Sequence, residues 1–92
     1  MAALENPAKP SLAAGCRWAA EEGEERTLLF PEGAIRLRGP GRDILERCDG
    51  QHTVQQIVNE LQVRYRAADP TRIANDVGNF LQELHQKRIV DF

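Results

Sequence analysis

Cys48 and His52 are the one cysteine–histidine pair in this 92-residue chain with the i, i+4 spacing of a helix. A thiol and an imidazole held close together can act as a nucleophile and its base. Cys48, however, ends a short apolar segment just before the Asp49-Gly50 turn, which is a typical position for a core thiol. The chain has neither a glycine-rich phosphate loop nor a G-x-S-x-G motif. We therefore expect no catalytic residues and predict that the protein is not an enzyme.

Metal binding would need ligands from distant parts of the chain. Cys16 and His85 could join Cys48 and His52 in a zinc site, but no C-x-x-C spacing supports this. One acidic loop carries four carboxylates, from Glu21, Glu22, Glu24 and Glu25. Adjacent acids in a loop repel one another and lack the geometry of a cation site. We expect a solvated hairpin loop, no metal and no cofactor.

Composition sets limits on the class of protein. The length allows one domain, and we expect a flexible N-terminal arm over residues 1–12 and a single domain over residues 13–92. Aromatic residues make up only 5% and the net charge is −2, which disfavours a phosphate-binding surface. We expect no nucleic acid and no membrane partner. The N-terminus lacks the apolar run of an export signal, so the expected location is the cytoplasm, with both cysteines reduced.

The N-terminal half predicts a three-stranded antiparallel meander over residues 15–20, 26–30 and 34–38. Pro31-Glu32-Gly33 forms the second turn, and the acidic loop forms the first. In this order the third strand lies at the edge of the sheet and leaves a row of backbone groups unpaired. Such an edge can bind a peptide as an added strand, or pair with itself in a homodimer. Basic residues fall in the strands and would favour a peptide with carboxylates; they are Arg17, Arg26, Arg36 and Arg38.

Three helices are predicted to follow. The segment Arg38-Gly39-Pro40-Gly41 ends the strand, and a short helix contains residues 43–48. Thr53 and Gln56 form a capping box for the second helix, and Asp69 and Pro70 begin the third. Residues 89–92 are an apolar tail, either a fourth strand or a plug on the core. The expected core consists of Trp18, Leu28, Phe30, Ile35, Leu37, Leu45, Ile57, Leu61, Val77, Phe80 and Leu84.

This order of elements predicts an α+β, winged-helix-like fold, for which DNA binding is the alternative function. The third helix would be the recognition helix and could use Arg72, Asn75 and Asn79 for base contacts. It also carries acids, and the chain lacks the basic excess that phosphate binding requires.

Two motifs make the assignment more specific. Leu28-Leu29-Phe30-Pro31-Glu32-Gly33 is followed about fifteen residues later by Cys48-Asp49-Gly50. Together with the apolar pattern of the helices, these segments resemble the pyrroloquinoline quinone (PQQ) biosynthesis protein D family, from about Leu12 to the C-terminus. This chain departs from the usual family pattern at Arg38-Gly39-Pro40-Gly41, where members commonly have Asn and a helix-capping residue.

The resemblance implies a peptide chaperone, a recognition element for ribosomally made, modified peptides. Members bind the PQQ precursor peptide and deliver it to a radical SAM enzyme. By position, the expected peptide-binding residues are Ala34, Ile35, Arg36, Leu37 and Arg38 on the third strand, and Asp76, Val77 and Phe80 on the third helix. The polar flank of that helix is the second open surface, and there we expect the enzyme to dock on Arg72, Asn79, Glu83 or Lys87.

Overall fold

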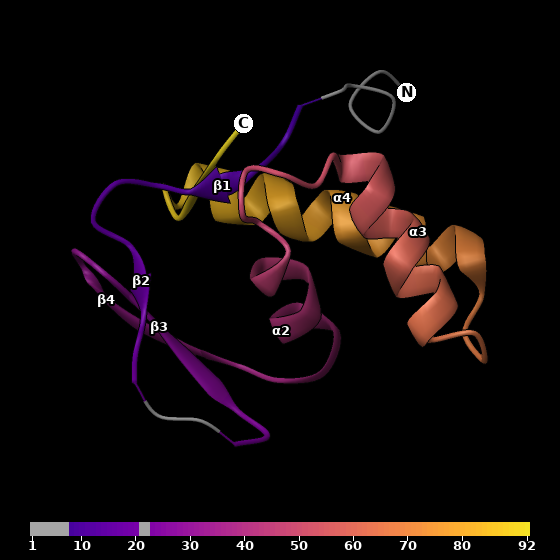
Figure 1. The fold of residues 1–92 in the computed structure, drawn as a ribbon, viewed down its shortest axis with the longest axis horizontal. Helices are drawn as coiled ribbons and strands as arrows, with labels where there is room; N and C mark the ends of the chain where they lie inside the picture. Colours follow the sequence, from indigo (N-terminus) through magenta and orange to yellow (C-terminus); the bar gives the residue numbers. More distant parts are fainter. Residues whose placement is uncertain (1–7, 21–22) are drawn as a thin grey trace.

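The computed structural model describes residues 8–20 and 23–92, which form an α+β fold (Figure 1). A three-stranded antiparallel sheet has the order β2-β3-β4, from β2 (Arg17–Trp18), β3 (Arg26–Phe30) and β4 (Gly33–Leu37). The helices are α2 (Gly39–Glu46), α3 (Val54–Arg64) and α4 (Pro70–Gln86). The predicted meander followed by three helices is confirmed. Glu21 and Glu22 of the acidic loop lie outside the described residues.

A second, two-stranded sheet joins the two ends of the described chain. β1 (Ser11–Leu12) pairs antiparallel with β5 (Val90–Asp91), so the apolar tail is a strand, as one of the two alternatives predicted. Ser11 and Leu12, the last two residues of the expected arm over residues 1–12, are therefore held in a strand. Pro10 is buried, and its carbonyl oxygen accepts from the Gly50 N–H at 2.9 Å. Residues 1–7, the remainder of that arm, lie outside the described range.

Local sequence patterns predicted the first residue of two of the three helices correctly. The Thr53 hydroxyl accepts from the Gln56 N–H at 3.1 Å, and the Gln56 side chain accepts from the Thr53 N–H at 2.8 Å, which completes the capping box of α3. The Asp69 carboxylate accepts from the Thr71 N–H at 3.0 Å and caps α4. The third boundary was misplaced. α2 begins at Gly39 rather than near Asp43, because Pro40 is compatible with the first helical turn.

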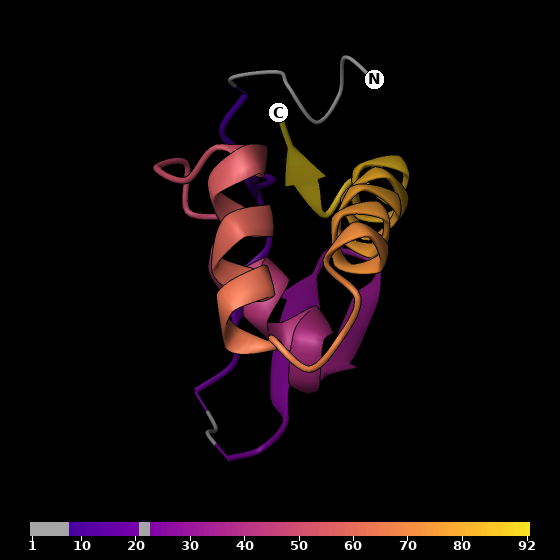
Figure 2. The same ribbon diagram turned by 90° about the vertical axis from the view of Figure 1, so that its right-hand side faces the viewer.

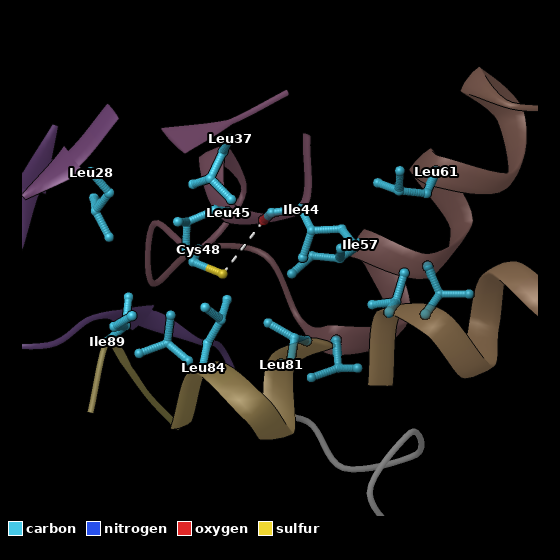
Figure 3. Close-up of a cluster of buried hydrophobic side chains, with 14 residues drawn as sticks. Leu28, Leu37, Ile44, Leu45, Cys48, Ile57, Leu61, Leu81, Leu84 and Ile89 are labelled. Atoms are coloured by element: carbon cyan, nitrogen blue, oxygen red, sulfur yellow. Dashed lines mark hydrogen bonds between the residues drawn. The ribbon is translucent and has the colours of Figure 1, made fainter. Parts of the chain in front are cut away.

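The core lies where the sheet, α2, α3 and α4 meet, and in Figure 3 its side chains point toward one another from all four. Leu28, Ile57 and Ile89 are completely buried. The sequence also assigned Trp18, Phe30, Ile35 and Phe80 to this core, but they are only partly buried and pack against its margin. Cys48 is buried, as its position before the Asp49-Gly50 turn indicated, and the other buried core positions are Ile44, Val54, Val58, Leu81, Ile89 and Val90.

Candidate functional site

Strand β4 is one edge of the three-stranded sheet, and the two-residue β2 is the other. Strand β4 pairs with β3 on one side, and within residues 8–20 and 23–92 no strand pairs with its other side. The register places Arg26 opposite Leu37, Leu28 opposite Ile35 and Phe30 opposite Gly33. The edge is therefore five residues long and begins one residue earlier than the predicted strand, while Arg38 becomes the N-cap of α2.

One hydrogen bond decides which backbone groups of β4 face outward. The Ala19 N–H donates to the Thr27 carbonyl oxygen at 2.9 Å, in continuation of the β2–β3 register. Thr27 therefore directs its backbone groups toward β2. Because backbone direction alternates along a strand, Leu28 directs its groups toward β4 and pairs with Ile35.

It follows that Ile35 and Leu37 use their N–H and C=O groups within the sheet. Ala34 and Arg36 have the opposite parity and present theirs to the open side. The sequence left this parity undecided. The side chains divide in the same way: Leu37 is buried and Ile35 partly buried, whereas Ala34 and Arg36 are exposed.

Helix α4, seen nearly end-on in Figure 2, lies on the same side of the molecule as the purple strands of the sheet. Its C-terminal end lies near the β3–β4 turn and Phe80 lies near the end of β4, so the helix and the strand run in opposite directions. Near the β3–β4 turn, Pro31 and Glu32 share a hollow with Lys87 and Arg88. At the other end of β4, the Phe80 ring lies near Leu37 across Gly41. A Cβ built on Gly41 would stand 3.5 Å from the Phe80 ring and 3.6 Å from the Leu37 side chain.

Just beyond this contact lies an apolar pocket of about 290 Å³ between α2, α3 and α4. Ile44, Ile73 and Val77 form part of its wall, and Asp76 stands among its lining residues. Pro40, only two residues beyond the Arg38 N-cap, belongs to the same pocket. Of the predicted helix residues, Asp76 and the buried Val77 line this pocket together with α2, and only Phe80 lies near β4, at Leu37. Their role in binding a peptide stays a prediction.

The four predicted docking residues are exposed, three of them on α4 and the fourth, Lys87, at its C-cap. Arg72 contacts Asp76 at 3.8 Å, and Lys87 contacts Glu83 at 3.4 Å, both with i,i+4 spacing. Asn79 lies exposed between these two pairs in sequence. The surface is polar and locally neutral, and its role in docking also stays a prediction.

The four arginines that were expected in the strands do not form one basic face, and Arg38 lies outside β4. Arg26 is engaged: its guanidinium donates to Glu46 at 2.9 Å and lies 4.2 Å from the centre of the Trp18 ring. Burial disfavours ionisation of Glu46, but hydrogen bonds from Arg42 and Arg26 outweigh this and lower the pKa of the carboxyl. Arg26 therefore fastens β3 to α2, while Arg36 and Arg38 remain exposed at the edge.

A second polar cluster holds α2 against the end of α3. The Tyr65 hydroxyl donates to the Asp43 carboxylate. The same carboxylate forms an ion pair with Arg64, whose Nε lies 2.9 Å from Oδ2 of Asp43. Burial and this hydrogen bond raise the pKa of Tyr65. Tyr65 also lines the apolar pocket, so the cluster shapes one of its walls. The pairing joins residues 22 positions apart, and no local pattern in the sequence indicated it.

The Cys48 thiol and the His52 ring have separate partners. The Cys48 thiol donates to the Ile44 carbonyl oxygen at 3.4 Å, and burial raises its pKa to about 12 (Figure 3). The His52 ring contacts Asp49 at 3.1 Å and Glu60 at 3.2 Å. A buried, protonated thiol is a poor nucleophile. Across the described ranges, no three histidine, cysteine or acidic side chains gather as a metal site would require.

The family profile of coenzyme PQQ synthesis protein D (PqqD) matches residues 25–90, most of the chain. This chain belongs to the PqqD family. A relative from Methylococcus capsulatus, described as a PqqA binding protein, is 41% identical over 63 residues, which are 67% of this chain and 64% of that protein. A PqqA binding protein of Xanthomonas euvesicatoria is 32% identical over 98% of both chains.

Solved structures agree with the PqqD assignment. The solution structure of the PqqD part of Methylobacterium extorquens PqqCD, described as a stand-alone recognition element, superposes with a TM-score of 0.69. It is 34% identical, over 90% of this chain and 88% of that one. The heterocyclase TruD shares the fold, with a TM-score of 0.63 at 22% identity over 91% of this chain and 11% of its own length. In the described part of our PqqD-family chain, no helix has the length and apolarity to cross a membrane.

Proposed function

We propose that this PqqD-family protein is a peptide chaperone of PQQ biosynthesis. It binds the precursor peptide PqqA as an additional strand along β4 and presents it to a radical SAM enzyme in the cytoplasm. The names of its relatives, PqqA binding proteins, support the choice of peptide. The observation that carries the proposal is the outward parity of Ala34 and Arg36 on an edge strand that lies beside α4.

Strand addition suits the two open backbone positions. Each of Ala34 and Arg36 offers an N–H donor and a C=O acceptor, the set that an incoming strand pairs with. Main-chain pairing gives affinity without reading side chains, so selectivity must come from the surfaces on either side of the edge.

Those two surfaces differ in chemistry. On the inner side, alternate peptide side chains would face Phe80, Ile35 and the pocket near Pro40, all apolar. On the outer side, the remaining peptide side chains would share a face with Arg36 and Arg38. A peptide with apolar residues at every second position would therefore fit the inner surface.

The chain acts by binding, and the chemistry belongs to its partner. The enzyme would dock on the outer flank of α4, at Arg72, Asn79, Glu83 or Lys87, while the peptide occupies β4. Adjoining surfaces for peptide and enzyme would let one protein hold both together, which raises the effective concentration of peptide at the enzyme.

The same edge could also pair with a second copy. Symmetric antiparallel pairing of two β4 strands would bring Arg36 and Arg38 of both copies onto a shared face, and like charges across strands are destabilising. DNA binding has less support, because Arg72 is already paired with Asp76 and the net charge is −2. We therefore favour the peptide as the occupant of the edge.

Titration of the isotope-labelled protein with synthetic PqqA, followed by NMR, tests the proposal. The amide signals of Ala34 and Arg36 should move most within β4, together with signals of Phe80 and Val77. Residues of α3 that face away from this side, such as Asn59, serve as the internal control. Shifts confined to α3, or no shifts at all, would contradict strand addition at β4.

A further inference from the structure

The carboxylate of Glu25 lies between the side chains of two arginines at the edge of the sheet. Its Oε1 lies 3.4 Å from Nη1 of Arg36, and its Oε2 lies 3.6 Å from Nη1 of Arg38. All three side chains are open to solvent: the arginines are 73% and 74% exposed, and Glu25 is 42% exposed. The two guanidinium groups therefore form a carboxylate-binding position that the protein fills with its own side chain.

The carboxylate-binding position between Arg36 and Arg38 lies next to the unpaired backbone groups of β4. Arg26 pairs with Leu37, so Glu25, one residue earlier, comes opposite Arg38. Arg36 pairs with Thr27 and has its backbone groups directed outward. Arg36 thus offers an incoming strand both main-chain hydrogen bonds and a cation on the outer face. A peptide residue opposite Arg36 would place its side chain on that same face.

We infer that Arg36 and Arg38 select an acidic side chain on the outer face of the bound strand, and that Glu25 occupies their carboxylate site until the peptide replaces it. The inference rests on the proposed strand addition and names a class of peptide residue, aspartate or glutamate, at or diagonal to the position opposite Arg36. An exposed ion pair holds its partners weakly, so an incoming carboxylate can exchange with Glu25 at little cost.

The neighbouring acid of the same loop provides a matched control. The Glu24 backbone carbonyl accepts from Arg42 at 3.1 Å, a contact that a glutamine at this position would keep. Glu25→Gln and Glu24→Gln remove the same charge from adjacent positions, but only the first releases Arg36 and Arg38. A general electrostatic effect on a charged peptide would appear in both variants, whereas release of the carboxylate site would appear in one.

The experiment measures PqqA affinity by calorimetry at low and high salt for the wild type, Glu25→Gln, Glu24→Gln and Arg36→Gln. At low salt we expect Glu25→Gln to bind about two- to five-fold more tightly, Arg36→Gln to bind weaker by a similar factor, and Glu24→Gln to match the wild type. PqqA analogues with each acidic residue changed to its amide should include one that no longer distinguishes wild type from Arg36→Gln.

The outcomes separate this inference from the proposed function. If the wild type binds PqqA and Glu25→Gln binds equally well, Glu25 does not occupy the site and the inference fails while strand addition stands. If the wild type does not bind PqqA, both fail. Should Glu25→Gln fold poorly, the Arg36 and Arg38 Nε–H signals of the wild type decide: they must shift with PqqA and stay unshifted with the amide analogue.

Discussion

Phe80 on α4 lies near Gly41 on α2, where an added Cβ would stand 3.5 Å from the aromatic ring and 3.6 Å from Leu37. The ring is only partly buried at the margin of the core. One of its neighbours is thus the last residue of the proposed peptide-binding strand. Phe80 therefore belongs to the surface that we propose for the peptide as much as to the fold.

We expect Phe80→Ala to remain folded and to lose peptide affinity. Truncation of a fully buried aromatic costs about 3–5 kcal/mol, so this partly buried ring should cost roughly half as much. As a member of the expected core, Phe80 would carry the full cost, and its observed partial burial lowers that expectation. Peptide affinity should fall about ten-fold.

Denaturant unfolding and calorimetry would measure the two effects of Phe80→Ala. Leu84→Ala is the control, because Leu84 is 1% exposed and its truncation should cost about 2–5 kcal/mol of stability. A Phe80→Ala variant that is folded and binds PqqA like the wild type would remove Phe80 from the binding surface.

The parity of β4 makes a sharp prediction for proline. Arg36→Pro removes an outward N–H, so the variant should stay folded. Its binding free energy for the peptide should become weaker by about 1–3 kcal/mol. Leu37→Pro removes an N–H that is directed toward β3 and should destabilise the domain. Circular dichroism scores folding and calorimetry scores affinity. The reverse pattern would show that our parity is inverted.

The docking surface can be tested by charge reversal on α4. Glu83→Lys or Lys87→Glu should weaken binding of the radical SAM enzyme and leave peptide affinity within about 1 kcal/mol, as expected for exposed charges. The double exchange keeps opposite charges at these two positions, which form an i,i+4 pair at 3.4 Å in the native chain, and so controls for the loss of that pair. Equal loss of enzyme and peptide would indicate one merged site, whereas no loss of either would place the enzyme elsewhere.

Acid stability should report on the loop between α2 and α3. Hydrogen bonds from His52 and from the backbone N–H groups of Gln51 and His52 lower the pKa of Asp49 to about 2. A carboxyl with a depressed folded-state pKa stabilises the fold above its unfolded pKa, near 4, and this contribution is lost as pH falls toward 2. The free energy of unfolding should therefore drop over this range. In Asp49→Asn the drop, followed by urea unfolding at pH 2 to 5, should be smaller; an unchanged slope would exclude Asp49 as a source.

Much of this fold could be predicted from the sequence, because it depends on interactions between residues that are close in the chain. The capping box of Thr53 and Gln56, the Asp69-Pro70 helix start and the strand at Arg26–Phe30 each depend on residues within a few positions of one another. Local patterns such as these act through the backbone of the same segment, so they survive without knowledge of the tertiary structure. The order of the meander follows from the short connections between its strands.

Only the tertiary structure decided the features on which the proposed binding depends. The outward parity of Arg36 follows from the β3–β4 register and the Ala19–Thr27 hydrogen bond, and a shift of one residue would reverse it. Pairing of Ser11 with Asp91 and the capture of Arg26 by Glu46 join parts of the chain that are distant in sequence. These contacts form because packing brings the segments together. Their energy lies in long-range burial and pairing, which no periodicity or capping signal encodes.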